Sequence, residues 1–259
     1  MANDGQKTKE QVVVEAATVV VFRNGGPDAP EILMIQRAKE LSFAGSAVVF
    51  PGGKIHESDR ELARSLGAMH GDDTAARIAC IREVIEETGL VIGISQRASA
   101  DQAQAARAML ADREDLAPVL GQFGWTLDLE CLVPFARWVP TFKPGRIFDT
   151  RFYLANLGSG NVELTPDLGE STRLFWASAR DALDLIETRA IKAIYPTRRN
   201  LERLAQFASF DDAAMHAAET PERTVSPWIV QGEVEQMLHI PEGIGYPVTA
   251  APLSQIAID

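Results

Sequence analysis

The spacing of apolar residues is most informative between residues 75 and 89. Isoleucines recur there at steps of three and four residues, at Ile78, Ile81 and Ile85. Glu83, Glu86 and Glu87 fall on the opposite side of the same helical wheel, within about a third of a turn of one another. The pattern predicts an amphipathic helix with an acidic outer face, and Gly89 is its stop signal.

Runs of β-branched and apolar residues predict strands on both sides of this helix. Strands are expected at 11–22, 31–36, 47–50, 92–94, 125–132, 135–138, 147–154, 174–177 and 228–230. Further helices are expected at 99–120, 178–189, 197–208 and 211–219. Ser178 is a predicted N-cap, and the polar residues around 71–74 predict a loop in which Asp73 or Thr74 caps the central helix. A turn is expected at 24–27. This order of elements predicts an α/β protein with a mixed sheet between helices.

The acidic face has two interpretations. Like charges at this spacing destabilise an isolated helix by about 0.2–0.5 kcal/mol per pair, and an acidic run usually just faces solvent. A hard divalent cation such as Mg²⁺ would relieve the repulsion, because it binds carboxylate oxygens together with phosphate oxygens. The upstream sequence favours the cation: Pro51-Gly52-Gly53 follows a predicted strand, and such a glycine turn lets backbone approach a ligand.

Residues 82–90, Arg-Glu-Val-Ile-Glu-Glu-Thr-Gly-Leu, resemble the second half of the signature of Nudix hydrolases. Gly53 matches the first glycine of that signature, but Asp59 stands where the family has glutamate. The 22 residues from 60 to 81 replace an interval of seven. A subgroup that hydrolyses coenzyme A and acyl-coenzyme A carries an insertion at this place, and the segments 137–141 and 148–153 also resemble it.

The resemblance implies one Nudix domain with an α/β/α sandwich fold over residues 11–259, after a disordered tail at 1–10. Insertions are expected at about 60–74 and 99–124, and a helical C-terminal extension from about 197. The cofactor implied is Mg²⁺ or Mn²⁺, held by Glu83, Glu86, Glu87 and the carbonyl of Gly52. Gly53, Asp59, Arg82 and Gly89 are expected to support this site, with Arg82 bracing a carboxylate for which Asp59 is the candidate.

The general base is not fixed in position across the family. Glu170 resembles such a base in its place before the last expected strand, and a solvent-facing acid is an equal reading of it. Glu86 is the other candidate, and Glu83 completes the catalytic set with these two.

Four cations are candidates for substrate contacts, namely Arg37, Lys54, Arg137 and Arg151. Arg37 ends an expected strand and Lys54 follows the glycine turn, and each is equally well an ordinary surface cation. An arginine fork would suit a coenzyme A 3′-phosphate. Trp138 and Phe142 would stack an adenine or fill the core, and we favour the core.

Composition and net charge limit the classes of partner that the protein is expected to bind. The chain has 259 residues and a net charge of −11, which argues against binding a nucleic acid polymer and leaves a small nucleotide-type substrate. No apolar run is long enough to span a membrane, and the polar start lacks an export signal. Cys80 and Cys131 fit small core residues in a reducing cytoplasm. A homodimer is compatible with the family.

Three functions remain open from the sequence. The first is hydrolysis of a phosphoanhydride in coenzyme A or acyl-coenzyme A, a substrate that rests on the resemblance alone. The second is the same chemistry on ADP-ribose, NADH or a nucleotide sugar. The third is a non-catalytic nucleotide-sensing regulator, which the three retained glutamates disfavour.

Overall fold

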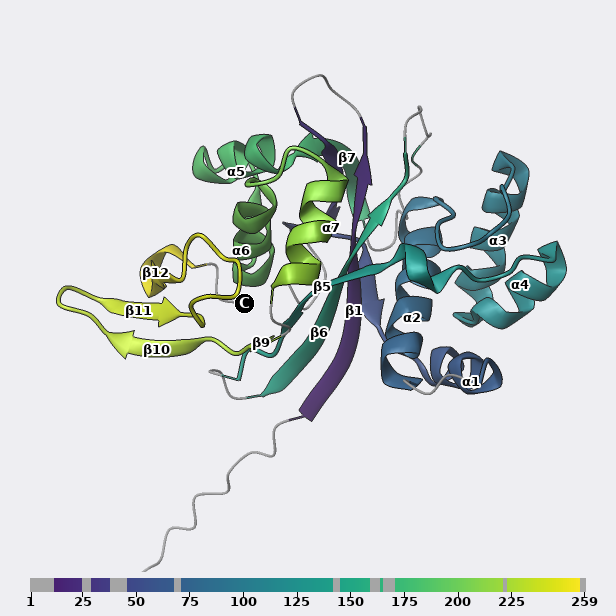
Figure 1. Cartoon of the computed structure of the whole chain (residues 1–259), viewed down its shortest axis with the longest axis horizontal. Coiled ribbons are helices and arrows are strands. Elements are labelled where there is room, and N and C mark those ends of the chain that lie inside the picture. Colours follow the sequence, from purple (N-terminus) through teal and green to yellow (C-terminus); the bar gives the residue numbers. More distant parts are fainter. Residues whose placement is uncertain are drawn as a thin grey trace, which may run out of the picture.

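A computed structural model describes residues 12–24, 29–37, 46–67, 71–141, 145–158, 164, 171–220 and 223–256. The expected tail at 1–10, most of the expected turn at 24–27, Phe142 and Glu170 lie outside these residues. A twisted sheet runs through the middle of the molecule and carries helices on both faces (Figure 1). The predicted α/β/α sandwich is therefore confirmed, whereas the proposed division into a tail, a domain and insertions stays a prediction.

The central sheet is mixed, as predicted. In the described residues its path is β8-β3-β2-β1-β6-β5-β9, with β4 also paired to β1 and β7 to β2. The strands are β1 (Val12–Arg23), β2 (Glu31–Arg37), β3 (Ala47–Val49), β4 (Gly52–Lys54), β5 (Val133–Trp138), β6 (Arg146–Asn156), β7 (Ser171–Ser178), β8 (Lys192–Ala193) and β9 (Thr224–Val225). The long strands β1 and β6 are parallel, while β2 is antiparallel to β1.

Two hydrophobic cores lie on opposite faces of the sheet. Alternation along β1 sends Val19 and Val21 to one core and Val20 and Phe22 to the other. The helices on the first face are α1 (Glu57–Ser65), α2 (Gly71–Thr88), α3 (Ala100–Arg113) and α4 (Leu116–Phe123). On the second face lie α5 (Ala179–Glu187), α6 (Tyr195–Leu204) and α7 (Phe210–Glu219) (Figure 1). Ser178 caps α5 through its side chain, as predicted.

The sheet splits along β1, and the split positions the glycine turn. β2 pairs with β1 only at Phe22 and Arg23, whereas β4 pairs with the earlier residues Ala16 to Thr18. Pro51 lies at the branch, where its carbonyl accepts a hydrogen bond from the N–H of Val19 at 2.9 Å. The turn that contains Gly52 and Gly53 thus becomes part of the sheet beneath α2.

Several local predictions are wrong. The helix α1 was not predicted, and the loop expected around 71–74 is helical instead. Because α2 begins at Gly71, neither Asp73 nor Thr74 is its N-cap. The expected helix at 99–120 breaks into α3 and α4 at Glu114, whose backbone is left-handed.

The expected strands at 92–94 and 125–132 reduce to one bridge between Ile94 and Leu127 and a short 3-10 helix at Leu129–Cys131. Trp125, Leu127 and Leu132 pack into the core around α2. Their apolar pattern therefore reflects packing against a helix.

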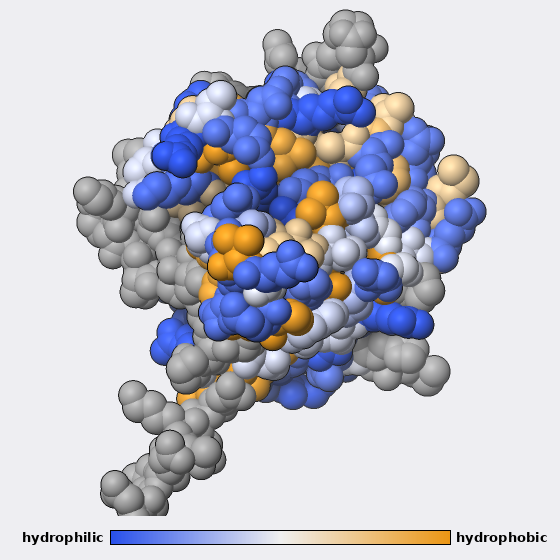
Figure 2. All heavy atoms as spheres, turned by 90° about the vertical axis from the view of Figure 1, so that its left-hand side faces the viewer, coloured by the Kyte–Doolittle hydropathy of each residue, from blue (hydrophilic) through white to orange (hydrophobic). Residues whose placement is uncertain are grey.

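The C-terminal region forms a small second sheet of β10 (Trp228–Gln231), β11 (Gln236–His239) and β12 (Ala250–Pro252), followed by a 3-10 helix at Leu253–Gln255. The face that carries it is mostly hydrophilic with apolar patches (Figure 2). Trp228, Ile229 and Val230 contribute exposed apolar surface there. Cys80 and Cys131 are free thiols, as predicted. Among the described residues, no helix has both the length and the apolarity to cross a membrane.

The hydroxyl of Tyr246 joins the C-terminal region to the main core. It accepts a hydrogen bond from Trp138 Nε1 at 2.9 Å and donates one to Asn200 Oδ1 at 2.8 Å. Trp138 is almost fully buried by these contacts and fills the core.

We predict that Tyr246→Phe lowers the free energy of unfolding by about 1–3 kcal/mol, because Trp138 and Asn200 lose their buried partner. Urea unfolding followed by tryptophan fluorescence measures the loss. Tyr195→Phe is the matched control: its hydroxyl makes one longer bond, of 3.2 Å, to the carbonyl of Leu238, and we expect a smaller loss. Equal stability of Tyr246→Phe and the parent would contradict this account.

Candidate active site

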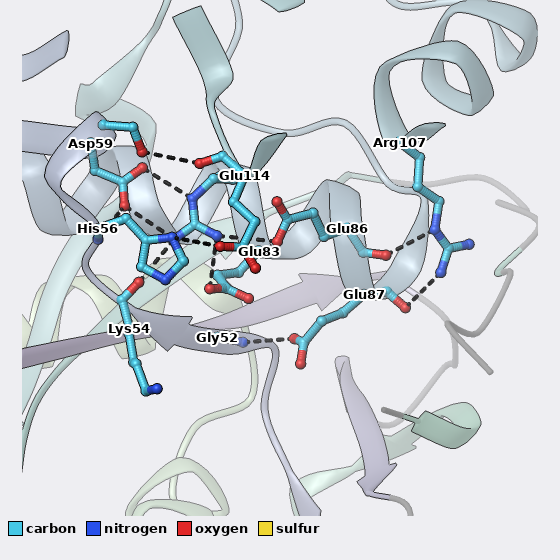
Figure 3. Close-up of polar contacts among 11 residues, drawn as sticks. Gly52, Lys54, His56, Asp59, Glu83, Glu86, Glu87, Arg107 and Glu114 are labelled. Atoms are coloured by element: carbon cyan, nitrogen blue, oxygen red, sulfur yellow. Dashed lines mark hydrogen bonds and ion pairs between the residues drawn. The ribbon is translucent and has the colours of Figure 1, made fainter. Parts of the chain in front are cut away.

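The guanidinium of Arg82 is the centre of the site, and it is fully buried. Its Nε and Nη2 donate to the two carboxylate oxygens of Asp59 at 3.1 and 3.0 Å. Nη1 donates to Glu83 Oε1 at 2.9 Å and to Glu86 Oε2 at 3.1 Å. Nη2 also donates to the carbonyl of Lys54 at 2.8 Å. Arg82 therefore links α1, α2 and β4. Figure 3 shows three of the acidic residues that it binds, Asp59, Glu83 and Glu86.

Asp59 comes from the helix that the sequence did not predict. It lies in the first turn of α1, where its Oδ2 also accepts the backbone N–H of His56 at 2.8 Å. One carboxylate thus satisfies the start of α1 and the buried guanidinium of Arg82. The contact expected between Arg82 and Asp59 is present.

Both glycines of the turn are required by close approach. Gly52 has a φ of 154°, and a Cβ there would lie 2.4 Å from the carbonyl oxygen of Ala17. A Cβ on Gly53 would lie 2.2 Å from Glu83 Oε1. The backbone N–H of Gly52 donates to Glu87 Oε2 at 2.9 Å, so the turn contacts two carboxylates of α2.

Crowded carboxylates and burial shift the ionisation of this site. Burial raises the pKa of Glu86 to about 8; Arg82 opposes this rise, while Glu83 and Glu114 add to it. Burial alone would lower the pKa of Arg82, but the bond to Asp59 and the charges of Glu83 and Glu86 raise it. Arg82 therefore stays charged, and an additional positive charge near Glu86 would be favourable.

The three glutamates of α2 do not converge on one point. Arg82 binds Glu83 and Glu86, whereas the N–H of Gly52 binds Glu87. Accordingly, no group of three or more His, Cys, Asp or Glu side chains is arranged to hold a metal ion among the described residues. Without a bound cation, Arg82 supplies the positive charge next to Glu83 and Glu86.

The donor set nevertheless fits Mg²⁺ or Mn²⁺. Three carboxylates and the carbonyl of Gly52 are hard oxygen donors. Glu86 Oε1 is buried and has no hydrogen-bond partner, which is costly unless a ligand binds it. Glu83, Glu86, Glu87 and Gly52 are therefore the residues that would hold the ion.

The expected substrate cations lie in different places. Arg37 ends β2, and its Nε is buried without a hydrogen-bond partner. The side chain of Lys54 is exposed and points away from Asp59 (Figure 3).

Arg137 and Arg151 form ion pairs away from the three glutamates of α2. Arg137 forms a two-point ion pair with Asp149, at 2.8 and 2.6 Å. Arg151 lies 3.9 Å from Asp73, near the start of α2. Ten residues separate Asp73 from Glu83, or about 15 Å of helix. Their role in substrate binding stays a prediction, as does the role of Glu170 as general base.

Sequence reasoning missed two residues from the 99–124 segment. Arg107 of α3 donates through Nε to the carbonyl of Glu86 at 2.8 Å and through Nη2 to that of Glu87 at 3.3 Å. It thereby satisfies carbonyls at the end of α2, where Gly89 (φ 75°) ends the helix as predicted. The second is Glu114, at the break between α3 and α4. The periodicity of an expected helix carries no signal for either contact.

No protein-family model matches the chain. It is 24% identical to the acyl-coenzyme A diphosphatase NUDT19 of Gallus gallus over 242 residues, which covers 72% of this chain and 64% of that protein. It is also 24% identical over 234 residues to the Homo sapiens protein of the same name, covering 70% of this chain and 62% of that one. The chain thus spans less than two thirds of the length of these relatives.

Among solved structures, a Nudix hydrolase from Alicyclobacillus acidocaldarius matches with a TM-score of 0.68 and 29% identity. The match covers 79% of this chain and 96% of that chain. It extends the likeness beyond the signature segment to the fold as a whole.

We predict that Gly53→Ala weakens Mn²⁺ binding by about 10–100-fold, because its Cβ displaces the Glu83 carboxylate. Titration followed by electron paramagnetic resonance measures the affinity. Gly71→Ala is the matched control, since a Cβ there meets nothing within 4 Å. Undiminished Mn²⁺ affinity in Gly53→Ala would show that the placement of Glu83 does not matter for the cation.

We further predict that Asp59→Asn destabilises the protein by about 3–5 kcal/mol, because it removes one partner of a buried ion pair. Glu57→Gln, in the exposed pair of Glu57 with Arg64 on the same helix, should change stability by less than about 1 kcal/mol. Chemical denaturation compares the two. Similar small losses in both variants would refute the central role of Arg82.

Proposed function

We propose that this chain, which is similar to Nudix hydrolases in sequence and fold, is a metal-dependent diphosphatase that cleaves a phosphoanhydride in a nucleoside-diphosphate-linked small molecule. One observation supports this above all: the glycine turn, Arg82 and the glutamates of α2 contact one another as a single unit. A solvated acidic face, the simpler reading of the sequence, would not bury Glu83 and Glu87.

The residues of the site have separate tasks in cation binding and in positioning. A bound divalent cation supplies positive charge to the diphosphate oxygens and acidifies water. Glu83, Glu86 and Glu87 would bind this cation. The backbone N–H of Gly52 donates to Glu87 and so keeps its carboxylate in place. Arg82 keeps Glu83 and Glu86 oriented while Asp59 anchors its guanidinium. The residues thus pre-position oxygen donors before the substrate arrives.

For the substrate we propose coenzyme A or acyl-coenzyme A. The sequence similarity to acyl-coenzyme A diphosphatases supports this choice. The alternative is ADP-ribose, NADH or a nucleotide sugar, since the same site chemistry suits any diphosphate. A regulatory, non-catalytic role is disfavoured because all three glutamates are present. The choice of Mg²⁺ or Mn²⁺, a cytoplasmic location and a homodimer remain predictions.

We predict that the protein hydrolyses coenzyme A esters with Mg²⁺ or Mn²⁺ and that Glu87→Gln lowers kcat by about 10²–10³-fold. Glutamine can still accept the Gly52 N–H, so the melting temperature should stay close to that of the parent. The assay is phosphate-ester product formation across a panel of coenzyme A esters, ADP-ribose, NADH and nucleotide sugars.

The control is Glu61→Gln on the exposed side of α1, which should retain parental turnover. Cleavage of ADP-ribose without any coenzyme A ester would reject the preferred substrate. Parental turnover of Glu87→Gln on every accepted substrate would reject the metal site.

A further inference from the structure

Glu114 has an unusual backbone conformation for its residue type. Its φ of 50° and ψ of 37° are left-handed, a strained conformation for a residue with a side chain. Its N–H donates to the carbonyl of Leu110 at 2.8 Å, and its own carbonyl accepts the hydroxyl of Ser58 at 3.0 Å. The backbone is therefore held from both sides, by α3 and by α1.

This conformation directs the Glu114 side chain toward the carboxylates of α2. Its Oε2 lies 3.3 Å from His56 Nδ1, and the side chain points toward Glu83 (Figure 3). Its negative charge is also among the causes that raise the pKa of Glu86. The carboxylate thus lies at the same site as Glu83 and Glu86, although it comes from a segment outside the signature.

The side chain of Glu114 is much more exposed to solvent than those of the other carboxylates at the site. Its side chain is 64% exposed, against 12% for Glu83 and 16% for Glu86. Arg82 binds both of those glutamates. Glu114 alone in this group combines nearness to the site with open access to water, which a group that takes up and releases protons needs.

His56 orients this carboxylate without neutralising it. Burial and the nearby charge of Arg82 lower the pKa of His56, so the imidazole is neutral near pH 7. A neutral imidazole beside the carboxylate leaves the negative charge on Glu114. His56 itself begins α1, whose Asp59 holds Arg82, so Glu114 is tied to the frame of the site.

We propose that Glu114 is a catalytic residue of this site, the base that takes the proton of the attacking water; this rests on the proposed diphosphatase function. The water oxygen bonds to one phosphorus, and the bond from that phosphorus to the bridging oxygen breaks. The leaving phosphate ester keeps the bridging oxygen with its electron pair. The proton of the water passes to Glu114, which returns it to solvent.

The structure favours Glu114 over Glu86 as the base. Glu86 is largely buried and its Oε2 is bound to Arg82, so its better-supported task is to hold the cation. Glu170 lies outside the described residues. The break between α3 and α4 therefore serves to place Glu114 at the site, a role that the fold alone does not require.

We expect Glu114→Gln to lower kcat by about 10²–10⁴-fold. Mn²⁺ affinity, measured by electron paramagnetic resonance, and affinity for adenosine 5′-(α,β-methylene)diphosphate, measured by calorimetry, should stay unchanged. In Glu114→Ala, formate should restore part of the turnover, because a small carboxylate can reach so exposed a position. A structural role for Glu114 would give no such rescue.

Glu130→Gln is the matched control, an exposed glutamate on the same layer that should keep parental kcat. Parental turnover in Glu114→Gln, alongside an inactive Glu87→Gln, would overturn this proposal and leave the diphosphatase intact. A parallel loss of Mn²⁺ affinity and kcat in Glu114→Gln would overturn it too, by making Glu114 a metal ligand. If the parent protein cleaves no diphosphate, the proposed diphosphatase function itself is refuted.

Discussion

The buried guanidinium of Arg82 is the interaction on which the site depends. An unpaired charge in a protein interior is strongly destabilising, so Arg82 requires its carboxylate partners and the carbonyl of Lys54. These partners come from three elements, and satisfying one cation therefore sets the positions of α1, α2 and β4 together. Asp59 has a special place among them because it is as fully buried as Arg82 itself.

Two contacts outside the glutamate-bearing turn complete this arrangement. α1 provides Asp59, which binds the guanidinium of Arg82. α3 provides Arg107, whose bonds to the carbonyls of Glu86 and Glu87 hold the end of α2. Helix ends fray where their carbonyls lack partners. With both contacts, the turn of helix that carries the glutamates is held at its two sides.

The sequence predicted those parts of the molecule in which local periodicity matches the burial. The isoleucine spacing located α2 because Ile78, Ile81 and Ile85 pack in the core, and runs of β-branched and apolar residues located β1, β2 and β6. The prediction was wrong where tertiary contacts determine the local structure. The residues 125–132 look like a strand because they are apolar, yet they pack against α2. Contacts such as Arg107 to α2 join residues that are distant in sequence, and one sequence holds no record of them.

The geometry of Glu86 shows how a cation and Arg82 can share the same carboxylates. Asp59 and Lys54 hold the guanidinium in place, so a cation cannot simply displace it. Glu86 binds Arg82 through Oε2 and keeps Oε1 buried without a hydrogen-bond partner. That second oxygen can bind a cation while the first remains on Arg82. Arg82 then acts as an orienting partner of the metal-binding carboxylate, because a ligand held in the right rotamer loses less conformational freedom when the ion binds.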